Sequence, residues 1–592
     1  MLFPKLPYKF RKANQAAIEF AGINKTENYK DGNLRDSIGL STAEYPTLTQ
    51  SRPFALEGRI DIVDMHEHNG MLLTVSKDGS LHFDGKYLGK VKPSRKQYAA
   101  VNTRLCIFPD KMYIDLNDFT LHDLAEVLAE GTVAAGSKYA LFFEENVSDK
   151  VVSGDKVDIS GSPATLYDKA DVVVEKVEEN TITFPQNTFS GALSYVELTE
   201  DLSGETIINV EYYASGDGDV EILTNELFKV DIYDTVKAGR VLFYDGFGIG
   251  VWDKDRLNEV GRYDAERVYA GVADIEMSVY TFDGAVVKVN KHIPDLDYIC
   301  ESENRLWGVS NRTHTIYASA LGLPGVFTEF EVISTDSYAV AVASEDDFTA
   351  ICAYGGGVCC FKENRLHKIL GSFPAQYYMN EYEIAGVQKG SERSLQIIDE
   401  VLYYKGRYGV YAYSGGVPKL VSYELGNVET VAKASVADGL NYYISLGDGV
   451  YVYDKLHGLW MKHTSSEYAA MVTDGQLIYG LSNGVMFVNS GKVADSKWSA
   501  EFTPFDMRGF FKKGYSKLTI SAEMGKGSAL SVHVREDNQP WRKVYNQAAT
   551  NNMLLSVPLR VGRCDRFSVK IEGKGIVKLR GIARDIIVGS ER

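Results

Sequence analysis

The sequence is poor in residues that mark several classes of protein. It has 6 cysteines and 15 prolines among 592 residues, and no two cysteines form a CxxC pair. So sparse a set excludes a disulfide scaffold and predicts reduced, mostly buried thiols in a protein made in a cytoplasm. No run approaches the roughly 18 apolar residues that span a bilayer. The N-terminus, with Lys5 between two prolines, lacks the apolar stretch of a secretory signal. We therefore expect a soluble chain without a signal peptide.

Positive charge is also scarce. The chain has 63 Lys+Arg against 80 Asp+Glu, a formal net charge of −17. Such a balance disfavours tight general binding to nucleic-acid phosphates. A net-acidic protein can still surround DNA without holding it, because like charges repel. The 45% hydrophobic and 24% charged residues are an ordinary globular composition, which excludes wholesale disorder.

The commonest pattern along the chain is a short alternation of β-branched or aromatic with polar residues, closed by Asp-Gly, Asn-Gly or Gly-Gly. This pattern predicts β-hairpins. The 37 tyrosines and 26 phenylalanines agree, because aromatic side chains suit half-buried pleated surfaces. Helical periodicity appears only near Asp118–Glu130 and Lys12–Phe20. The sequence therefore predicts a nearly all-β protein.

One strand pattern, glycine and valine followed by alternating apolar or aromatic residues, recurs in the second half. Its marked aliphatic residues are Ile316, Val358, Val410, Val450 and Val485. They are 42, 52, 40 and 35 residues apart. Periods of this size, each with three or four short strands, are typical of propeller blades, which stack because one blade cannot bury both faces alone. Similar units occur at Lys77–Phe83 and Lys111–Ile114. We predict a β-propeller of six to eight blades; the alternative is a chain of separate β-sandwiches.

The repeat is interrupted once and then ends. Hairpin spacing changes between Glu126 and His292, which predicts an inserted β-barrel or sandwich, since a surface loop accepts long insertions at low entropic cost. From Trp498 onward the marked strand disappears, and a terminal β-sandwich is expected. The expected domains are an irregular arm over 1–52, first blades over 53–125, an inserted β domain over 126–292, remaining blades over 293–497, and the C-terminal sandwich over 498–592.

Candidate catalytic and nucleotide motifs are incomplete. Gly246–Gly250 is rich in glycine, but it leads into a strand rather than a helix, and no Gly-Lys-Ser/Thr follows. We interpret it as a β-turn. Ser76–Ser80 only partly matches the repeated turn of sialidase-like propellers, and no Gly-x-Ser-x-Gly elbow is present. No catalytic or cofactor-binding residue is assigned.

Candidate metal ligands are also incomplete. His66 and His68 could face one metal from a strand, but no third ligand is evident. Asp217–Asp219 and Glu345–Asp347 cluster oxygens without continuing as a calcium loop. Three cysteines lie close in sequence, but neighbours on a strand point to opposite faces, which favours buried thiols over a ligand set; they are Cys352, Cys359 and Cys360. We expect no metal, no cofactor and no catalytic turnover.

Five segments within roughly Asp295–Val421 carry a family resemblance: Cys300–Gly308, Thr315–Pro324, Ser334–Val340, Phe361–Lys368 and Gly390–Ser394. Through them the middle of the chain resembles propeller proteins encoded in the tail modules of tailed bacteriophages and prophages. The N-terminal part is similar to the opening of tail nozzle and stabilisation proteins, through Asn33–Asp36, Tyr45–Leu48, Arg52 and Pro53.

This resemblance implies a virion structural protein, a nozzle or tail-tip subunit located in the tail. It would form a homo-oligomeric ring, sixfold like the tails it resembles, below the portal-side and adaptor proteins and next to tail fibres or tip proteins. DNA would leave through the ring without specific binding, which agrees with the acidic charge. The inserted and terminal domains would contribute contacts between subunits. Trp498, Phe502 and Phe505 are candidates for an anchor, with burial inside the monomer as the alternative.

Two other functions fit a propeller. The chain could bind carbohydrate or protein outside a phage, or it could hydrolyse glycosides with a pair of carboxylates. Sequence alone does not select such a pair from 80 acidic residues. Rings that show no hydrolysis would favour the virion protein. Monomers that bind glycans would favour the binding propeller. Turnover that is lost when a single carboxylate is replaced would favour the glycosidase.

Overall fold

The protein is built from strands. The computed structural model describes residues 11–588, apart from 126, 134–139, 162–167, 186–187, 331–332, 506–511, 549–552 and the segments between strands over 189–285. Within these residues there is no α-helix, only strands and the 3-10 turns η2 (Pro374–Gln376), η3 (Glu392–Ser394), η4 (Tyr423–Leu425) and η5 (Val493–Asp495). No helix of the described residues is long and apolar enough to cross a membrane. The all-β prediction is confirmed.

The two segments with helical periodicity are strands. Lys12–Phe20 falls on β1 (Arg11–Ala17), which pairs along its whole length with β55 (Val577–Val588). Asp118–Glu130 contributes to β13 (Thr120–Asp123) and β14 (Val127–Val133), which lie in two different sheets. The helix prediction was wrong because helix propensity is a weak preference that ladder pairing and burial override.

The chain divides into two compact units. The first comprises 1–122, 296–318 and 339–592, and the second comprises 123–295 and 319–338.

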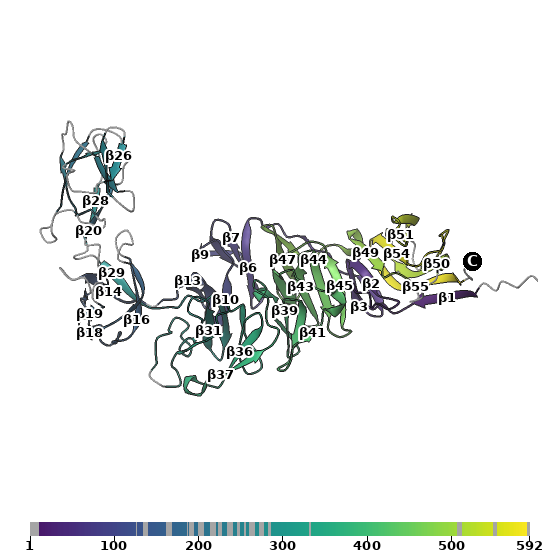
Figure 1. The fold of residues 1–592 in the computed structure, drawn as a ribbon, viewed down its shortest axis with the longest axis horizontal. Helices are drawn as coiled ribbons and strands as arrows, with labels where there is room; N and C mark the ends of the chain where they lie inside the picture. The colour runs from purple at the N-terminus through teal and green to yellow at the C-terminus, as the bar shows by residue number, and fades with distance from the viewer. Residues whose placement is uncertain are drawn as a thin grey trace, which may run out of the picture. The chain divides into compact units, whose positions relative to one another are not determined.

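Seven four-stranded antiparallel sheets follow one another along the chain. Apart from the ends of β13 and β33, they lie within the first unit (Figure 1). The first three contain β6 (Ile62–His68), β7 (Met71–Ser76), β8 (Ser80–Phe83) and β9 (Lys86–Lys90); β10 (Gln97–Val101), β11 (Arg104–Phe108), β12 (Met112–Asp115) and β13 (Thr120–Asp123); and β30 (Tyr298–Ser302), β31 (Arg305–Ser310), β32 (Thr315–Ala318) and β33 (Tyr338–Ala341). The next two contain β34 (Ala350–Ala353), β35 (Gly357–Phe361), β36 (Arg365–Leu370) and β37 (Tyr378–Glu383); and β38 (Gln396–Ile398), β39 (Val401–Gly406), β40 (Gly409–Tyr413) and β41 (Lys419–Leu420). The last two contain β42 (Ala434–Ala437), β43 (Asn441–Leu446), β44 (Gly449–Asp454) and β45 (Leu459–Thr464); and β46 (Ala470–Thr473), β47 (Ile478–Ser482) and β48 (Val485–Val488) with β5 (Ala55–Leu56).

Neighbouring sheets bury their faces against one another. Among the first strands, β10 contacts β30, β30 contacts β34, β38 contacts β42, β42 contacts β46, and β46 contacts β6. The core is shared in the same way: Leu73 of one sheet packs in a cluster with Leu105 of the next, and Phe361 with Leu402. A small sheet gains most of its stability from such shared apolar burial.

The recurring strand pattern marks the third strand of most of these sheets. It falls on β32, β40, β44 and β48, and the earlier units fall on β8 and β12. Gly357–Phe361 is the exception, because it forms β35, the second strand of its sheet. The pattern therefore locates strands correctly but does not fix the register of each repeat, which explains the uneven spacing.

Both ends of the chain build one two-sheet sandwich. Its N-terminal strands are β1, β2 (Leu34–Ile38), β3 (Leu40–Glu44) and β4 (Thr47–Gln50). Its C-terminal strands are β49 (Lys497–Phe502), β50 (Gly514–Met524), β51 (Ala529–Glu536), β52 (Arg542–Ala548), β53 (Met553–Pro558), β54 (Phe567–Lys574) and β55. One sheet has the order β3-β4-β55-β50-β53 with β1 on β55, and the other β2-β49-β54-β51-β52.

The expectation of an irregular arm over 1–52 is therefore wrong for 11–50. Leu34, Leu40 and Leu48 are at most 2% exposed and share one core with Trp498 and the later strands. Four short strands without a long alternation escape detection in sequence. β3 pairs with its neighbour β4, but β1, β2 and β4 pair with strands more than 400 residues away. The sandwich also packs on the sixth sheet, where β2 and β3 contact β45.

The second unit holds the insertion. Its seven-stranded sheet, in the order β17-β16-β29-β14-β15-β19-β18, surrounds a core that includes Leu141, Val157, Ile182 and Val289. The strands are β14 (Val127–Val133), β15 (Ala140–Phe143), β16 (Lys156–Ser160), β17 (Lys169–Val173), β18 (Lys176–Glu178), β19 (Thr181–Thr183) and β29 (Val286–Lys291). Residues 319–338 join this unit, and Lys291 pairs with Glu329 at 3.0 Å.

Further strands lie between β19 and β29 in the sequence and form three separate small sheets. They are β20 (Ser194–Leu198), β21 (Thr206–Tyr212), β22 (Glu221–Ile222), β23 (Phe228–Tyr233), β24 (Val241–Tyr244), β25 (Ile249–Asp253), β26 (Arg256–Glu259), β27 (Arg267–Ala270) and β28 (Met277–Thr281). The insertion thus contains a second insertion.

Candidate functional site

A cavity of about 440 Å³ lies among five of the seven sheets, along their first strands. It is lined by Met65–Glu67 of β6, Lys96–Tyr98 at β10, Arg393–Gln396 around β38, Ala434–Ala437 of β42, and Met471–Thr473 of β46. The walls are strands rather than loops, so their side chains are held by sheet pairing on either side. We take this cavity as the candidate site.

A buried ion pair lies beside the cavity. The Arg393 guanidinium contacts both carboxylate oxygens of Asp64, at 2.6 Å and 2.8 Å, and donates to the Lys96 carbonyl at 3.0 Å. The Asp64 side chain is 1% exposed and also accepts from the Lys96 backbone N–H at 2.8 Å. One bidentate pair therefore joins the first, second and fifth sheets, and charge-assisted bonds of this kind are strong and directional.

A second buried ion pair lies next to the first. The Lys96 ammonium contacts the Asp110 carboxylate, with side chains 0% and 4% exposed, and donates to the Ser94 hydroxyl at 3.0 Å. Buried charges are costly unless they are paired and hydrogen-bonded. Lys96 takes part in both arrangements, through its backbone and its ammonium, so the two pairs form one buried cluster.

His66 is partly buried at the wall of the cavity. Its ring stacks on Tyr98, with centroids 4.4 Å apart, and burial lowers the pKa of His66 to about 4. Burial, followed by the nearby Asp64 charge, raises the pKa of Tyr98 well above its usual value. His68 instead lies at the turn, where its Nε2 is 3.1 Å from the Asn69 amide. No group of three His, Cys, Asp or Glu side chains among the described residues is placed to hold a metal ion.

Four cysteines gather near the third and fourth sheets. Cys352 of β34 is the cross-strand partner of Cys359 in β35, and Cys360 and Cys300 lie within electrostatic reach. Burial, and then the neighbouring thiols, raises the pKa of Cys300, Cys352 and Cys360 well above the usual value. A raised pKa favours the thiol, which is a weaker nucleophile than the thiolate. Cys359 and Cys360 are both 0% exposed because the two faces of β35 are covered.

The remaining sequence candidates are turns or lie outside the described residues. Asp347 forms an exposed ion pair with Lys389 at 2.6 Å, which lowers the pKa of Asp347, and the Asp346 carbonyl accepts from the Lys362 ammonium. Asp78 accepts from the Ser80 backbone N–H at 3.0 Å, as a turn residue does. Asp217–Asp219 and most of Gly246–Gly250 lie outside the described residues.

The proposed aromatic anchor is part of the monomer's core. Trp498, Phe502 and Phe505 are 2%, 0% and 1% exposed. The Trp498 indole N–H donates to the Gly575 carbonyl at 3.1 Å, inside the sandwich. These side chains cannot reach another subunit, so the anchor hypothesis is wrong and the alternative of burial in the monomer is confirmed.

Comparisons with known proteins do not assign the chain to a family. No protein-family model matches it, and no curated protein does. Among solved structures, it is similar to the extracellular domain of a putative one-component system from B. thetaiotaomicron, at 8% identity over 92% of this chain and 90% of that one, with a TM-score of 0.25. PorZ of the Porphyromonas gingivalis type-IX secretion system matches at 11% identity over 92% and 81%, with a TM-score of 0.25.

A third similar structure is an exo-β-1,3-galactanase from Phanerochaete chrysosporium with galactose. It matches at 10% identity over 59% of this chain and 96% of that one, with a TM-score of 0.18. At these values the similarities carry no argument about activity, ligand or location.

The ion cluster was missed in the sequence. Asp64 lies within the alternation of β6, and Arg393 lies within η3, in a segment that carries the family resemblance but indicates no ion pair. The available signal was a charged residue inside an otherwise apolar strand, in Ile62-Val63-Asp64-Met65. Its partner was not predictable, because 329 residues separate the two side chains.

Proposed function

We propose that the chain is a structural protein of a tailed-bacteriophage virion, a tail nozzle or tail-tip subunit. The sequence resemblance over Asp295–Val421 carries the proposal. The resembling segments are scaffold elements: Cys300–Gly308 lies on the β30–β31 hairpin, and Arg393 of Gly390–Ser394 joins three sheets. Residues that position sheets in a rigid body are what a structural subunit requires.

We further propose that the seven sheets close into one seven-bladed propeller. The seventh sheet takes its fourth strand, β5, from before the first sheet, where Ala55 pairs with Val488 and Leu56 with Phe487. Its first strand, β46, contacts β6. In such a ring, a strand that precedes the first sheet completes the last sheet. This pairing ties the two ends of the ring together and stabilises it.

The DNA path of this proposal runs between subunits and not through a propeller. The cavity of about 440 Å³ has room only for a small molecule, and the Arg393–Asp64 pair lies at its wall. Duplex DNA, about 20 Å across from its groove dimensions, requires the lumen of a homo-oligomeric ring. We propose sixfold symmetry, with portal-side and tip proteins as neighbours and no catalytic turnover.

The proposal is tested on virions. Antibodies raised against the purified chain should label one end of the tail of phage particles induced from the source strain. Labelling, together with the chain's peptides in digests of purified particles, would support a tail subunit. Particles that contain no such peptides would overturn it.

A carbohydrate-binding propeller is the second candidate. The cavity favours it, because the stacked His66–Tyr98 pair gives an aromatic wall, while Gln97, Gln396 and Thr473 supply neutral polar groups. Hydrolysis is less favoured, since Asp64 is fully engaged by Arg393 and Lys96, and Glu67 accepts from the Gly70 backbone N–H. Binding of monosaccharides in ligand-observed NMR that disappears in Tyr98→Ala would favour this function over the nozzle.

A further inference from the structure

Charge is distributed unevenly along the chain. Residues 123–295 hold 14 Lys+Arg and 34 Asp+Glu, whereas 497–592 hold 18 Lys+Arg and 9 Asp+Glu. The C-terminal part of the sandwich is therefore basic within a chain whose net charge is −17. A basic region within an acidic protein is the electrostatic footprint of an anionic partner.

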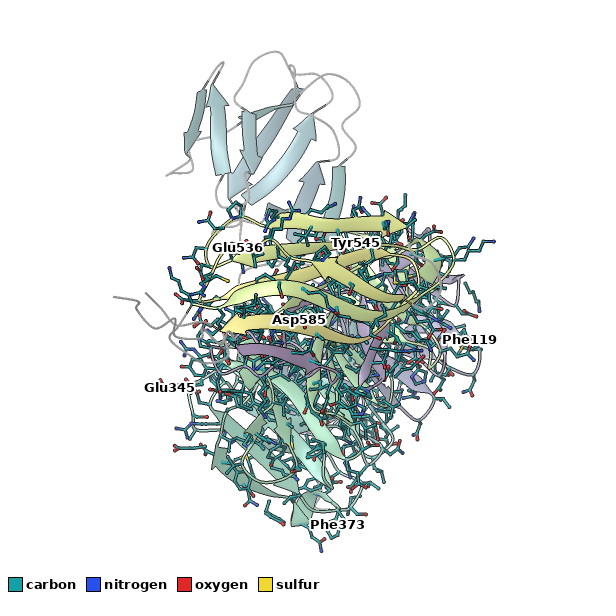
Figure 2. The ribbon with its side chains drawn as sticks, turned by 90° about the vertical axis from the view of Figure 1, so that its right-hand side faces the viewer. Phe119, Glu345, Phe373, Glu536, Tyr545 and Asp585 are labelled. Carbon is teal, nitrogen blue, oxygen red and sulfur yellow. The ribbon has the colours of Figure 1, made fainter. Side chains whose placement is uncertain are left out.

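Much of the positive charge gathers at one end of the sandwich. Five strands begin or end there: β50 begins at Gly514, β51 ends at Glu536, β52 begins at Arg542, β53 ends at Pro558 and β54 begins at Phe567. Figure 2 looks onto this sandwich and labels Glu536 and Tyr545, on the two strands joined by one of these loops. We call this end, with its loops, the basic end; its cationic residues are Lys512, Arg535, Arg542, Lys543, Arg560, Arg563 and Arg566.

Two acidic residues at the basic end hold its loops together. The Glu536 carboxylate accepts from the Gly562 backbone N–H at 2.9 Å and pairs with Arg542 at 3.0 Å. Asp537 accepts from the backbone N–H groups of Asp565 and Arg566, at 2.9 Å and 2.8 Å. Their carboxylates are thus used to fasten the loop at 559–566 to the loop at 537–541.

Arg535, Arg542 and Arg566 form ion pairs with Glu501, Glu536 and Glu27, and the other four cations are left available. Lys512, Lys543, Arg560 and Arg563 are exposed and form no ion pair with another described residue. Next to them, the Arg535 guanidinium lies over the Trp541 ring, 4.5 Å from its centroid. Exposed, unpaired cations are the groups that proteins use to neutralise the phosphates of a nucleic-acid backbone.

We propose that the basic end binds the phosphate backbone of DNA without reading its sequence. The described residues of the basic end provide no helix that could enter a groove and no preorganised set of side chains for base edges. Long, unpaired lysine and arginine side chains suit repeated phosphates, whose charge density exceeds that of most protein surfaces. The inference goes beyond the nozzle proposal and does not depend on it.

The test is fluorescence anisotropy of the full chain with a labelled random-sequence duplex of about 20 base pairs, a length sufficient for several phosphate contacts. Four contacts give a log–log salt slope of about −3.6, so affinity should fall about 150-fold between about 50 and about 200 mM salt. A second, unrelated duplex should bind equally well. The triple variant K543A/R560A/R563A should reduce the slope by about 2.7.

The matched control is K497A/K526A/K574A, which removes three lysines near the opposite end of the same sandwich and should bind like the parent chain. If the triple variant at the basic end is insoluble, R563A alone should still lower the slope by about 0.9. Absence of binding at low salt, or an equal loss in the control, would overturn the proposal. So would salt-sensitive self-association that the triple variant abolishes without any binding of duplex, because the partner would then be a second copy. Virion labelling decides the nozzle proposal separately.

Discussion

At the scale of single residues, buried charge is used to fasten sheets. Arg393 and Asp64 bring three sheets to one point, and Lys96 with Asp110 extends the cluster. Two further lysines act similarly: the Lys362 ammonium donates to the Ser344 carbonyl at 2.8 Å, and the Lys405 ammonium to the Gln388 side-chain oxygen at 2.7 Å. Burial lowers the pKa of Lys405 to about 8. The Lys405 contact reinforces a backbone hydrogen bond, which the Gln388 N–H donates to the Lys405 carbonyl at 2.9 Å.

Removal of one member of the central pair should be strongly destabilising. Arg393→Met leaves the Asp64 carboxylate buried beside the cavity without its cation, which costs about 3–5 kcal/mol of unfolding free energy. The exposed pair Lys389–Asp347 is the control, because Lys389→Met should cost under about 1 kcal/mol. Urea denaturation of both variants measures the difference; equal small losses would contradict a clamping role.

Acid should weaken the fold through two histidines, the partly buried His66 and the buried His463. Burial lowers the pKa of both His66 and His463 to about 4, below the usual 6.5. Between these values the unfolded chain binds protons that the folded chain does not, so stability falls as the pH drops from about 6.5 toward 4. Each group contributes about 3 kcal/mol at the low end. In thermal melts, His66→Gln should retain more of its neutral-pH Tm at pH 4.5 than the parent does.

At the scale of elements, strands from distant parts of the sequence complete sheets. β5 completes the seventh sheet, and β1 to β4 complete the sandwich. Alternation and turns correctly predicted the strands of 62–115 and 298–488, because those hairpins pair with sequence neighbours. The sandwich strands at 11–50 were missed, since Leu34 and Leu48 become core residues only through β49 and β55. Local pattern cannot reveal such pairing, and for the same reason it did not reveal the Asp64 cluster.

Truncation of a core leucine in the N-terminal strands should behave as a core mutation. Leu48→Ala removes a side chain that is 0% exposed, and should cost about 2–5 kcal/mol of unfolding free energy. Thr47→Ala, one residue away and partly exposed, is the matched control and should cost little. Chemical denaturation followed by tryptophan fluorescence, with Trp498 in the same core, reports the effect. An irregular arm would show no difference between the two variants.

Closure of the seven sheets predicts slow hydrogen exchange at the junction. The amides of β48 and β5 should exchange only through large-scale unfolding, as those of β44 do, because β5 covers the outer edge of the seventh sheet. Hydrogen–deuterium exchange with mass spectrometry on the intact chain measures this. Exchange of β48 within seconds, while β44 stays protected, would show an open junction.

At the scale of the whole molecule, the chain combines an acidic insertion, a stack of sheets with paired internal charges, and a sandwich with a basic end. Because β1 to β4 belong to the sandwich, deletion of 498–592 alone would leave Leu34, Leu40 and Leu48 without their core. A test of the sandwich in assembly must therefore remove both 1–50 and 497–592. The remaining sheets should stay soluble yet assemble poorly, since the proposed subunit contacts and the basic end would be gone.

The central claim is that the protein is a ring-forming subunit. Negative-stain electron microscopy of the purified full-length chain, with two-dimensional class averages, tests it most directly. The account predicts sixfold rings with an open lumen wide enough for a DNA duplex. A uniform population of monomers at micromolar concentration, at both low and moderate salt, would contradict it.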